Sequence, residues 1–330
     1  MAISNDVLSS TLRILLDEEV DNLFKAVPLL EEMRSSGGVE TYDGGQKLDV
    51  PLILAEHSSI TQLSNGYEPV NLAVKDALRN ASFNWCDFVA PVVITKKEEL
   101  SNKGPKAVVS IAEARMKSVM GLLQREVEKQ LIAGSSTVLT DLNTLRASNA
   151  ARANGGFMAG GAYGTGQSGT VGGIDTAVLS TFNNQYKRSG TLSISDMTDL
   201  YIQCQAYTPG GGSPNLIISS AETYRDYKAL LFANERFMAE SQLDGGRLAL
   251  MFHGARMYYD PFLDSVTDGT NDIRAYFLNT DHLKLAFDSD AQFEMEDFEH
   301  ISGYASRAAN ICTRLQMYVQ HLGSQGLLTK

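Results

Sequence analysis

The sequence predicts an α+β fold. A helical apolar period continues from Pro105 to Ala133, and an alternating, strand-like pattern occupies residues 311 to 320. Short apolar runs between turn residues predict further strands in the second half of the chain. Hydrophobic residues form 43% and charged residues 20% of the 330 residues, which indicates a folded chain with a substantial core.

The N-terminal stretch predicts an amphipathic helix. Apolar residues recur at steps of three and four between Leu8 and Val27, and Pro28 then interrupts the pattern. Acidic residues fill the other positions, which are expected to form a solvated face.

A long hairpin is predicted from Gly37 to Val74. Its expected strands are residues 39–42 and 48–55, with Gly44-Gly45 as the turn between them. Pro51 cannot donate to a central ladder, so its strand is expected at an edge. A two-stranded hairpin is marginally stable alone, so another part of the chain or a neighbouring molecule should cover its apolar face. That face comprises Leu48, Val50, Leu52 and Leu54.

The strongest local pattern predicts one long helix from Pro105 to Ala133. Pro105 suits a first turn and Gly134 suits a stop. At a rise of about 1.5 Å per residue, the helix is roughly 40 Å long. Its apolar face comprises Val108, Ala112, Met116, Val119, Met120, Leu123, Val127 and Leu131.

A glycine-rich loop is predicted from Gly155 to Gly173. Residues Gly164 to Gly169 match the dinucleotide pattern GxGxxG. No apolar strand precedes the match, and no acidic residue follows at the expected distance. A loop is therefore favoured over a nucleotide site.

Smaller elements follow the loop. Ser195 can cap a helix that continues to Cys204, and Ser219 with Glu222 forms a capping-box pattern before another helix. The predicted strands are residues 215–219, 248–252, 256–259, 274–278, 283–287 and 311–320.

Charge, cysteine content and hydropathy exclude several classes of protein. The net charge is −11 and the pI is near 5.0, the opposite of the basic surface that grips nucleic acid. Cys86, Cys204 and Cys312 lie far apart, which fits reduced thiols in a cytosolic setting and neither a disulfide framework nor a zinc site. No apolar run is long enough to cross a bilayer, and the first residues lack a signal-peptide pattern.

No catalytic, cofactor-binding or metal site is predicted. Walker, HExxH and GxSxG patterns are absent from the sequence. The acidic cluster around residue 268 lacks EF-hand spacing and favours a solvated turn. Scattered histidines are interpreted as structural, and the aromatic group as core. These residues are His57, His253, His282, His300 and His321; Asp264, Asp268, Asn271 and Asp272; and Phe83, Trp85 and Phe88.

The order of elements resembles the major capsid protein of tailed bacteriophages, the family with the Hong Kong 97 type fold. The stretches that carry the resemblance are the hairpin at 37–74, residues 83–94, the long helix that begins near Gly104, residues 172–175 followed by 214–220, and the C-terminal alternating strand.

The resemblance implies a four-part organisation. The expected parts are an N-terminal arm (1–36), an extended loop (37–75), a peripheral domain (76–134 and 285–330) with a long spine helix, and an axial domain (135–284). Lys47 falls in the extended loop, where some members carry a cross-linking lysine. Its partner is not identifiable, so no cross-link is predicted.

The resemblance also implies partners. Many copies would form pentamers and hexamers of an icosahedral shell, in which the neighbouring subunit covers the extended loop. A scaffolding protein during assembly, a portal protein at one vertex and a decoration or cement protein are the other expected partners. The packaged DNA would be enclosed without sequence-specific binding, and no membrane is involved. The expected location is the virion, assembled in the host cytoplasm.

Two other functions compete with this reading. One is an encapsulin-like nanocompartment shell of the same fold, which would hold a protein cargo in place of DNA. The other is an enzyme of unfamiliar family that uses the acidic turn at 264–272 or a scattered histidine.

Overall fold

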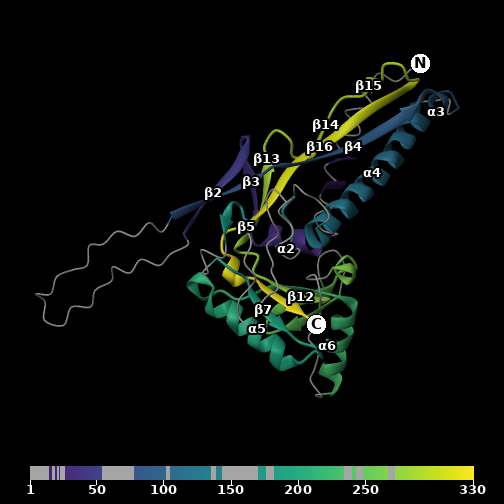
Figure 1. Cartoon of the computed structure of the whole chain (residues 1–330). Helices are drawn as coiled ribbons and strands as arrows, with labels where there is room; N and C mark the ends of the chain where they lie inside the picture. Colours follow the sequence, from purple (N-terminus) through teal and green to yellow (C-terminus); the bar gives the residue numbers. More distant parts are fainter. Residues whose placement is uncertain are drawn as a thin grey trace, which may run out of the picture.

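The computed structural model describes residues 15–16, 19–20, 22, 27–53, 78–101, 105–134, 139–142, 170–175, 182–233, 240–242, 248–266 and 272–330. These residues form two larger sheets, of six and seven strands, with a long helix beside the first (Figure 1). The predicted α+β class is confirmed. Leu8 to Val27 lies largely outside the described residues, and the first described helix of several turns is α2, Pro28–Ser35.

The six-stranded sheet is built around one long strand, β16. β16 pairs antiparallel with β4 from Ser306 opposite Thr95 to Leu315 opposite Cys86, and the pair forms an extended ribbon (Figure 1). Its members are β1 (Val39–Tyr42), β4 (Cys86–Thr95), β13 (Leu283–Asp288), β14 (Glu294–Met295), β15 (Glu299–His300) and β16 (Ser306–Val319). The alternating C-terminal strand is therefore confirmed, and it begins earlier than the apolar pattern indicates.

The long helix α4 has the predicted bounds, Pro105–Ala133, and runs beside the ribbon after the short helix α3, Lys96–Ser101 (Figure 1). Its apolar stripe packs into the main core with β4. The stripe residues Ala112, Met116, Met120, Leu123, Val127 and Leu131 are buried. One buried face from Ala112 to Leu131 explains why this helix was predictable from periodicity.

The seven-stranded sheet has the order β7-β17-β12-β8-β11-β10-β9. Parallel and antiparallel neighbours are mixed, since β8 pairs parallel with β11 and antiparallel with β12. The strands are β7 (Gln185–Arg188), β8 (Leu216–Ser219), β9 (Glu240–Gln242), β10 (Leu248–Phe252), β11 (Ala255–Tyr259), β12 (Ile273–Leu278) and β17 (Gly326–Thr329). The strands predicted between 215 and 278 are confirmed within a residue or two of their ends.

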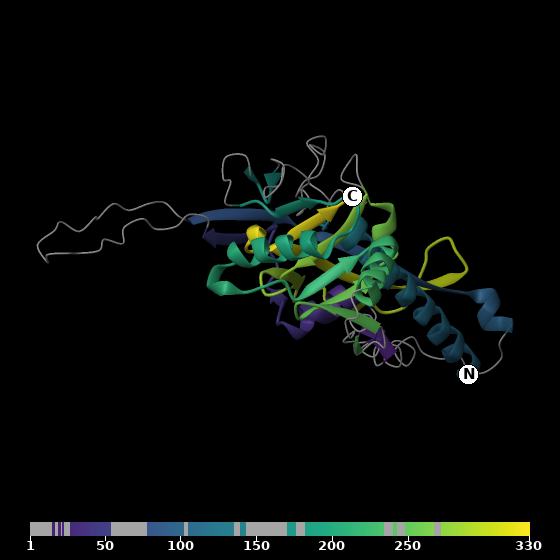
Figure 2. The ribbon, with the colours of Figure 1, turned by 90° about the horizontal axis from the view of Figure 1, so that it is seen from below.

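Helices α5 (Ile194–Ala206) and α6 (Ala221–Ala233) cover one face of this sheet (Figure 2). Ile217 and Phe277 join these helices in a separate core, whereas Ile218 and Tyr276, one position along the same strands, join the main core on the other face. Successive side chains of a strand point to opposite faces, so the sheet is buried on both sides.

Both helix caps differ by a position or two from the prediction. α5 begins after Ser193, whose hydroxyl accepts a hydrogen bond from the Ser195 N–H group. α6 begins after Ser220, whose hydroxyl accepts from the Thr223 N–H group. Ser219 is the last residue of β8, and its hydroxyl donates to the Tyr258 carbonyl. Two adjacent serines make the capping residue ambiguous in sequence.

The predicted hairpin between residues 39–42 and 48–55 is wrong in its pairing. β1 pairs parallel with β13, while β2 (Lys47–Ile53) pairs antiparallel with β3 (Leu78–Asn84). Side-chain hydrogen bonds link β1 to β16, since Glu40 Oε2 accepts from the Tyr318 hydroxyl at 2.7 Å and the Tyr42 hydroxyl lies 3.0 Å from that of Tyr318. The positive φ angles of Gly44 and Gly45 turn the chain from one sheet to the other.

The apolar face of β2 is covered by the chain itself, which corrects the expectation of a neighbouring subunit there. Leu48, Val50 and Leu52 belong to the main core and are at most 6% exposed. The remaining residues 54–74 of the predicted hairpin lie outside the described residues. Pro51 lies in β2, which pairs only with β3 among the described strands and is therefore an edge strand, as predicted.

A small hairpin, β5 (Thr170–Val171) and β6 (Ile174–Asp175), packs against β3. Gly172 has a φ of +55°, and a Cβ there would lie 2.7 Å from Phe83 Cζ, so glycine is required. These residues are the described end of the predicted glycine-rich loop, and Gly164 to Gly169 lies outside the described residues.

The division into arm, loop, peripheral and axial domains stays a prediction. β17 differs from it, because this strand pairs with β12 and β7 in the seven-stranded sheet instead of with the peripheral strands. The chain therefore crosses between the sheets once more near its C-terminus. Among the described helices, none is long and apolar enough to span a membrane.

Candidate functional site

The sequence-predicted chemical residues do not converge. His253 lies in the turn between β10 and β11 and His300 lies in β15, far apart in the fold, while His57 lies outside the described residues. His282 and His321 are the exception, with ring centroids 5.8 Å apart. Within the described part of the chain, no group of three His, Cys, Asp or Glu side chains could hold a metal ion.

The acidic turn has a structural role in its described part. One carboxylate oxygen of Asp264 accepts the Ala221 N–H group at the start of α6, and the other accepts the Tyr259 hydroxyl. Asp272 precedes β12, and its carbonyl accepts the Lys330 N–H group. Asp268 and Asn271 lie outside the described residues.

The aromatic group is core, as predicted. Phe83 is fully buried, Trp85 is 8% exposed, and Phe88 packs against the main core. The Phe83 ring lies 6.4 Å from the Tyr318 ring, which links β3 to β16. Lys47 is an exposed residue at the start of β2, opposite Asn84.

The described cysteines are free thiols, as expected. Burial raises the pKa of the Cys86 thiol to about 11 and raises that of Cys204 further. Both thiols are therefore protonated at neutral pH and poor nucleophiles.

The described chain instead concentrates polar contacts where its two sheets meet. Two segments cross there: residues 279–282 connect β12 to β13, and residues 320–325 connect β16 to β17. We call these two segments the junction. The Gln325 side chain joins them, because its Oε1 accepts the Asn279 N–H group at 2.9 Å and its Nε2 donates to the Asn279 carbonyl at 3.0 Å.

A second amide side chain repeats this arrangement. Asn215, before β8, accepts the Thr280 N–H group at 3.1 Å and donates to the Thr280 hydroxyl at 2.7 Å. Thr280 and Gln325 are fully buried. These neutral groups satisfy buried backbone atoms without burying charge, which gives the junction a defined geometry at modest electrostatic cost.

Helix α2 lies between the two sheets and contacts both (Figure 1). Glu32 pairs with Arg256 of β11 at 2.9 Å, and the Lys284 ammonium donates to the Gly37 carbonyl at 3.2 Å. Burial raises the pKa of Glu32, although Arg256 opposes the shift. The α2 segment and the turn after it thus contact both sheets.

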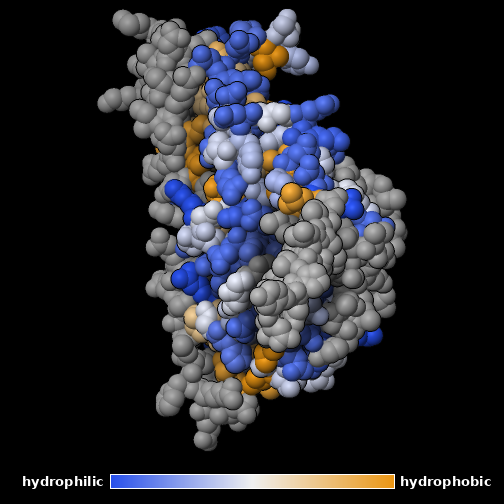
Figure 3. Space-filling model, turned by 90° about the vertical axis from the view of Figure 1, so that its left-hand side faces the viewer, coloured by the Kyte–Doolittle hydropathy of each residue, from blue (hydrophilic) through white to orange (hydrophobic). Residues whose placement is uncertain are grey.

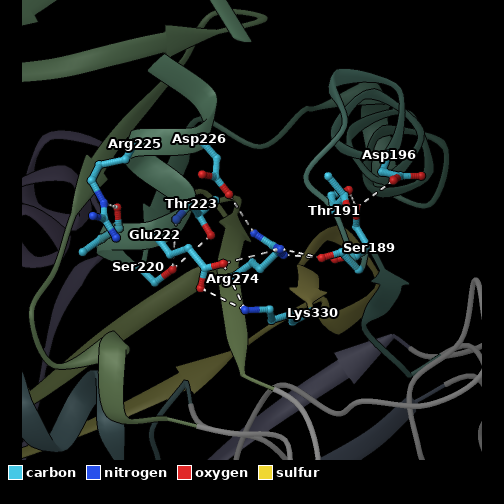
Figure 4. Close-up of polar contacts among 12 residues, drawn as sticks. Ser189, Thr191, Asp196, Ser220, Glu222, Thr223, Arg225, Asp226, Arg274 and Lys330 are labelled. Carbon is cyan, nitrogen blue, oxygen red and sulfur yellow. Dashed lines mark hydrogen bonds and ion pairs between the residues drawn. The ribbon is translucent and has the colours of Figure 1, made fainter. Parts of the chain in front are cut away.

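A charged cluster closes the seven-stranded sheet near the C-terminus (Figure 4). Arg274, whose side chain is 4% exposed, donates to the Ser189 carbonyl at 3.0 Å and the Gly190 carbonyl at 2.8 Å, and lies 3.4 Å from Asp226. A register shift of β12 at this residue aims the guanidinium toward α6. Because Arg274 pairs with acidic residues of α6 and bonds to the backbone after β7, we assign it a structural role.

Exposed apolar side chains are the remaining candidates for contacts with other molecules. On β4, Val89 is 60% exposed, and on α4 Leu122 is 65% exposed. Leu78 at the far end of β3 is 61% exposed, whereas Ala81 and Phe83 on the same strand are buried. Figure 3 shows one face on which hydrophobic residues form small separate groups among hydrophilic ones.

One face of the β4–β16 ribbon stays open to solvent. Along β4 the residues that face the core alternate with exposed ones, and Asp87, Val89 and Pro91 are exposed. Arg314, opposite Asp87, bonds to its carboxylate at 2.6 Å and to that of Asp288 at 3.2 Å. We call the outward residues Asp87, Val89, Pro91 and Val93 of β4, with Ala308, Asn310, Cys312 and Arg314 of β16, the ribbon face.

Sequence reasoning missed both the junction and the ribbon face as sites. The junction amides are single Asn and Gln residues near strand ends, which sequence does not distinguish from loop residues. The alternating pattern at 311–320 predicted a strand with two different faces. It did not show that one face of this strand and of its partner β4 is exposed to solvent.

The fold is that of phage capsid and encapsulin shell proteins. The structure is similar to a chain of the cyanophage A-1(L) capsid asymmetric unit, with a TM-score of 0.60 and 12% sequence identity. The match covers 92% of this chain and 92% of that chain. The capsid of an empty GTA particle has a TM-score of 0.56, with 11% identity and 89% and 88% covered. The holo-SrpI encapsulin of Synechococcus elongatus has a TM-score of 0.52, with 9% identity and 90% and 86% covered.

No family model matches the sequence, and no curated protein matches it. The structural likeness therefore rests on the whole arrangement of elements, as the predicted resemblance does.

Proposed function

We propose that this chain is a major capsid protein, a structural subunit that assembles as pentamers and hexamers into the icosahedral head of a tailed bacteriophage. The observation that carries the proposal is the shared fold over about nine-tenths of the chain and of its phage capsid neighbours. The ribbon face and the exposed Leu78 supply surface for contacts between copies.

The net charge of −11 supports an enclosing role over a DNA-gripping one. Packaged double-stranded DNA would be held without sequence-specific contacts, because a strongly basic wall would bind the phosphate backbone tightly. The proposed location is the virion, with assembly in the host cytoplasm. A scaffolding protein, a portal protein at one vertex and a decoration or cement protein are the further proposed partners.

A structural role agrees with the absence of a converged catalytic group in the described part of the chain. The proposed subunit has no enzymatic activity and needs no cofactor. The proposed division keeps an N-terminal arm, an extended loop, a peripheral domain and an axial domain, with β17 moved to the axial part.

An encapsulin-like shell is the second candidate, because the holo-SrpI encapsulin shares the fold. The content of the particles separates the two. Electron microscopy of the particles, with nuclease-protected DNA and co-purified protein measured on the same sample, tests both functions. Shells with protected DNA after infection support the capsid, and DNA-free shells that retain a stoichiometric protein cargo support the nanocompartment. A chain that forms no shells in either setting contradicts both.

A further inference from the structure

Two imidazole rings meet at the junction. His282 directly precedes β13 and His321 lies two residues after the end of β16, so each crossing segment contributes one ring. The ring centroids are 5.8 Å apart with an interplanar angle of 56°. The Gln320 N–H group donates to the His282 carbonyl at 2.8 Å, which holds the two segments, and with them the two rings, in register.

The His321 ring is partly buried beside η3 (Leu322–Ser324). A Cβ added at Gly323 would lie 3.1 Å from His321 Cε1, so the ring packs closely against the backbone of this turn. Its Nδ1 atom is buried, and no described protein group accepts or donates a hydrogen bond there. A proton added to this ring would gain no carboxylate partner.

The charged groups near the pair are few. Asp281 favours a charged His282 and Lys284 disfavours it, while His321 is influenced by His282. Tyr207, whose Cβ lies near Gly323, is 60% exposed. Burial lowers the pKa of His321 from 6.5 to about 4, and burial lowers the pKa of His282 as well. Both rings are therefore neutral at neutral pH.

We propose that His282 and His321 form a proton-controlled latch between the two sheets. With both rings neutral, the crossing segments stay packed and the Gln325 and Asn215 contacts hold the sheets in one orientation. When protons bind, the two charged rings repel one another and are stabilised by hydration. The segments of the junction then lose their packing, and the sheets can change their relative orientation.

The pH window follows from the lowered pKa of His321. An open junction takes up the proton near pH 6.5, whereas the closed junction takes it up only near pH 4. The open state therefore binds more protons between these values, and the closed state loses stability as the pH falls from 6.5 to about 4. Below about 4 the loss from this ring is complete. The proposal concerns the subunit itself and does not depend on the proposed function.

The double substitution His282→Gln and His321→Gln in the full chain tests the latch. The melting temperature of the wild type should fall as the pH goes from 7 to 4.5, and the double variant should lose much of this slope. His300→Gln, an exposed ring in β15, is the matched control and should keep the wild-type slope. Hydrogen exchange, corrected for the intrinsic pH effect, should rise with acid in peptides that contain 279–285 and 320–326 of the wild type only. Equal slopes and equal exchange in wild type and double variant overturn the proposal.

A measurement on the wild type keeps the proposal testable if the double variant does not fold. Histidine C2–H exchange followed by mass spectrometry gives a midpoint pH for each ring. The latch requires midpoints for His321 and His282 below 6.5, with His321 the lowest. Midpoints near 6.5 for both junction rings overturn it.

Discussion

The seven-stranded sheet and the β4–β16 ribbon differ in how many of their faces the chain covers. Every residue of β8, β12 and β17 is buried, because α5 and α6 cover one face of that sheet and the main core covers the other. Along β4, exposed and buried positions alternate. The first sheet is completed within one chain, whereas the ribbon offers a face that another molecule can cover. This difference fits the proposed role as one subunit of a larger assembly.

Met116→Pro should unfold the ribbon half of the molecule. Met116 is fully buried in the middle of α4, the helix that covers the inner side of β4. Proline removes a backbone hydrogen bond and clashes with the preceding turn, which costs about 3 kcal/mol or more, out of a total stability of about 5–15 kcal/mol. Circular dichroism and a thermal melt measure the loss. Met116→Leu, the volume-conserving control, should melt cooperatively, and a wild-type melt for the proline variant would contradict a continuous buried helix.

Alanine substitutions should lower the free energy of unfolding on both faces of β12 but on only one face of β4. On β12, Phe277→Ala and Leu278→Ala should both lose about 2–5 kcal/mol, since they point into different cores. On β4, Ile94→Ala should lose a similar amount, but Val89→Ala should stay within about 0.5 kcal/mol. Urea unfolding of the four variants provides the comparison. A large loss for Val89→Ala would show that the subunit itself covers the ribbon face.

Replacement of residues 55–76 by a short Gly-Ser linker should leave the subunit folded and prevent closed shells. The segment begins after β2 and ends before β3, so the buried residues Leu48, Val50 and Leu52 remain. A replacement that begins at Gly44 would remove β2 and with it part of the main core. Thermal melting checks the fold and electron microscopy checks assembly. Closed shells at wild-type yield would show that the segment contributes nothing to association.

Val89→Asp should reduce assembly while the melting temperature changes little. Val89 is 60% exposed and lies on the ribbon face, where an added carboxylate meets water in the free subunit and loses it on association. The matched variant Val92→Asp places the same charge in the core, where Val92 is 1% exposed, and should not fold. Shell formation by Val89→Asp at the wild-type level would exclude the ribbon face as a contact surface.

Lys330→Ala should have the smallest effect, below about 0.5 kcal/mol, because the pair is exposed and screened. Lys330 Nζ lies 3.0 Å from Glu222 Oε1, and this ion pair lowers the pKa of Glu222 below 4.5. A carboxyl group whose pKa is lowered by folding stabilises the protein at pH values above its unfolded-state pKa. This contribution is lost as the pH falls through the lowered pKa of the folded state. Wild type and variant should therefore differ slightly at pH 7 and converge in acid. A difference that grows in acid would contradict the pairing.

Sequence predicted the fold where one pattern persists over many residues. The α4 helix was found with its bounds because a single buried stripe continues from Ala112 to Leu131, and β16 was found because its faces alternate. The pairing of β1 was not predictable, because two short strands beside Gly44 look like a hairpin. The actual partner, β13, and the Tyr318 hydroxyl that bonds to Glu40 of β1 are both distant in sequence.

The candidate sites were harder to predict from the sequence than the fold was. Asn279 and Gln325 are separated by 46 residues and act through reciprocal contacts with backbone atoms, which have no residue-specific pattern. His282 and His321 were interpreted one at a time, so their proximity became visible only in three dimensions.

Sedimentation velocity of the purified full chain, alone and with a coexpressed scaffolding protein, tests the central claim most directly. The account predicts a population of uniform closed particles that contain many copies of the 35.9 kDa chain in at least one of these conditions. A folded chain that sediments as a single copy in every condition would contradict it.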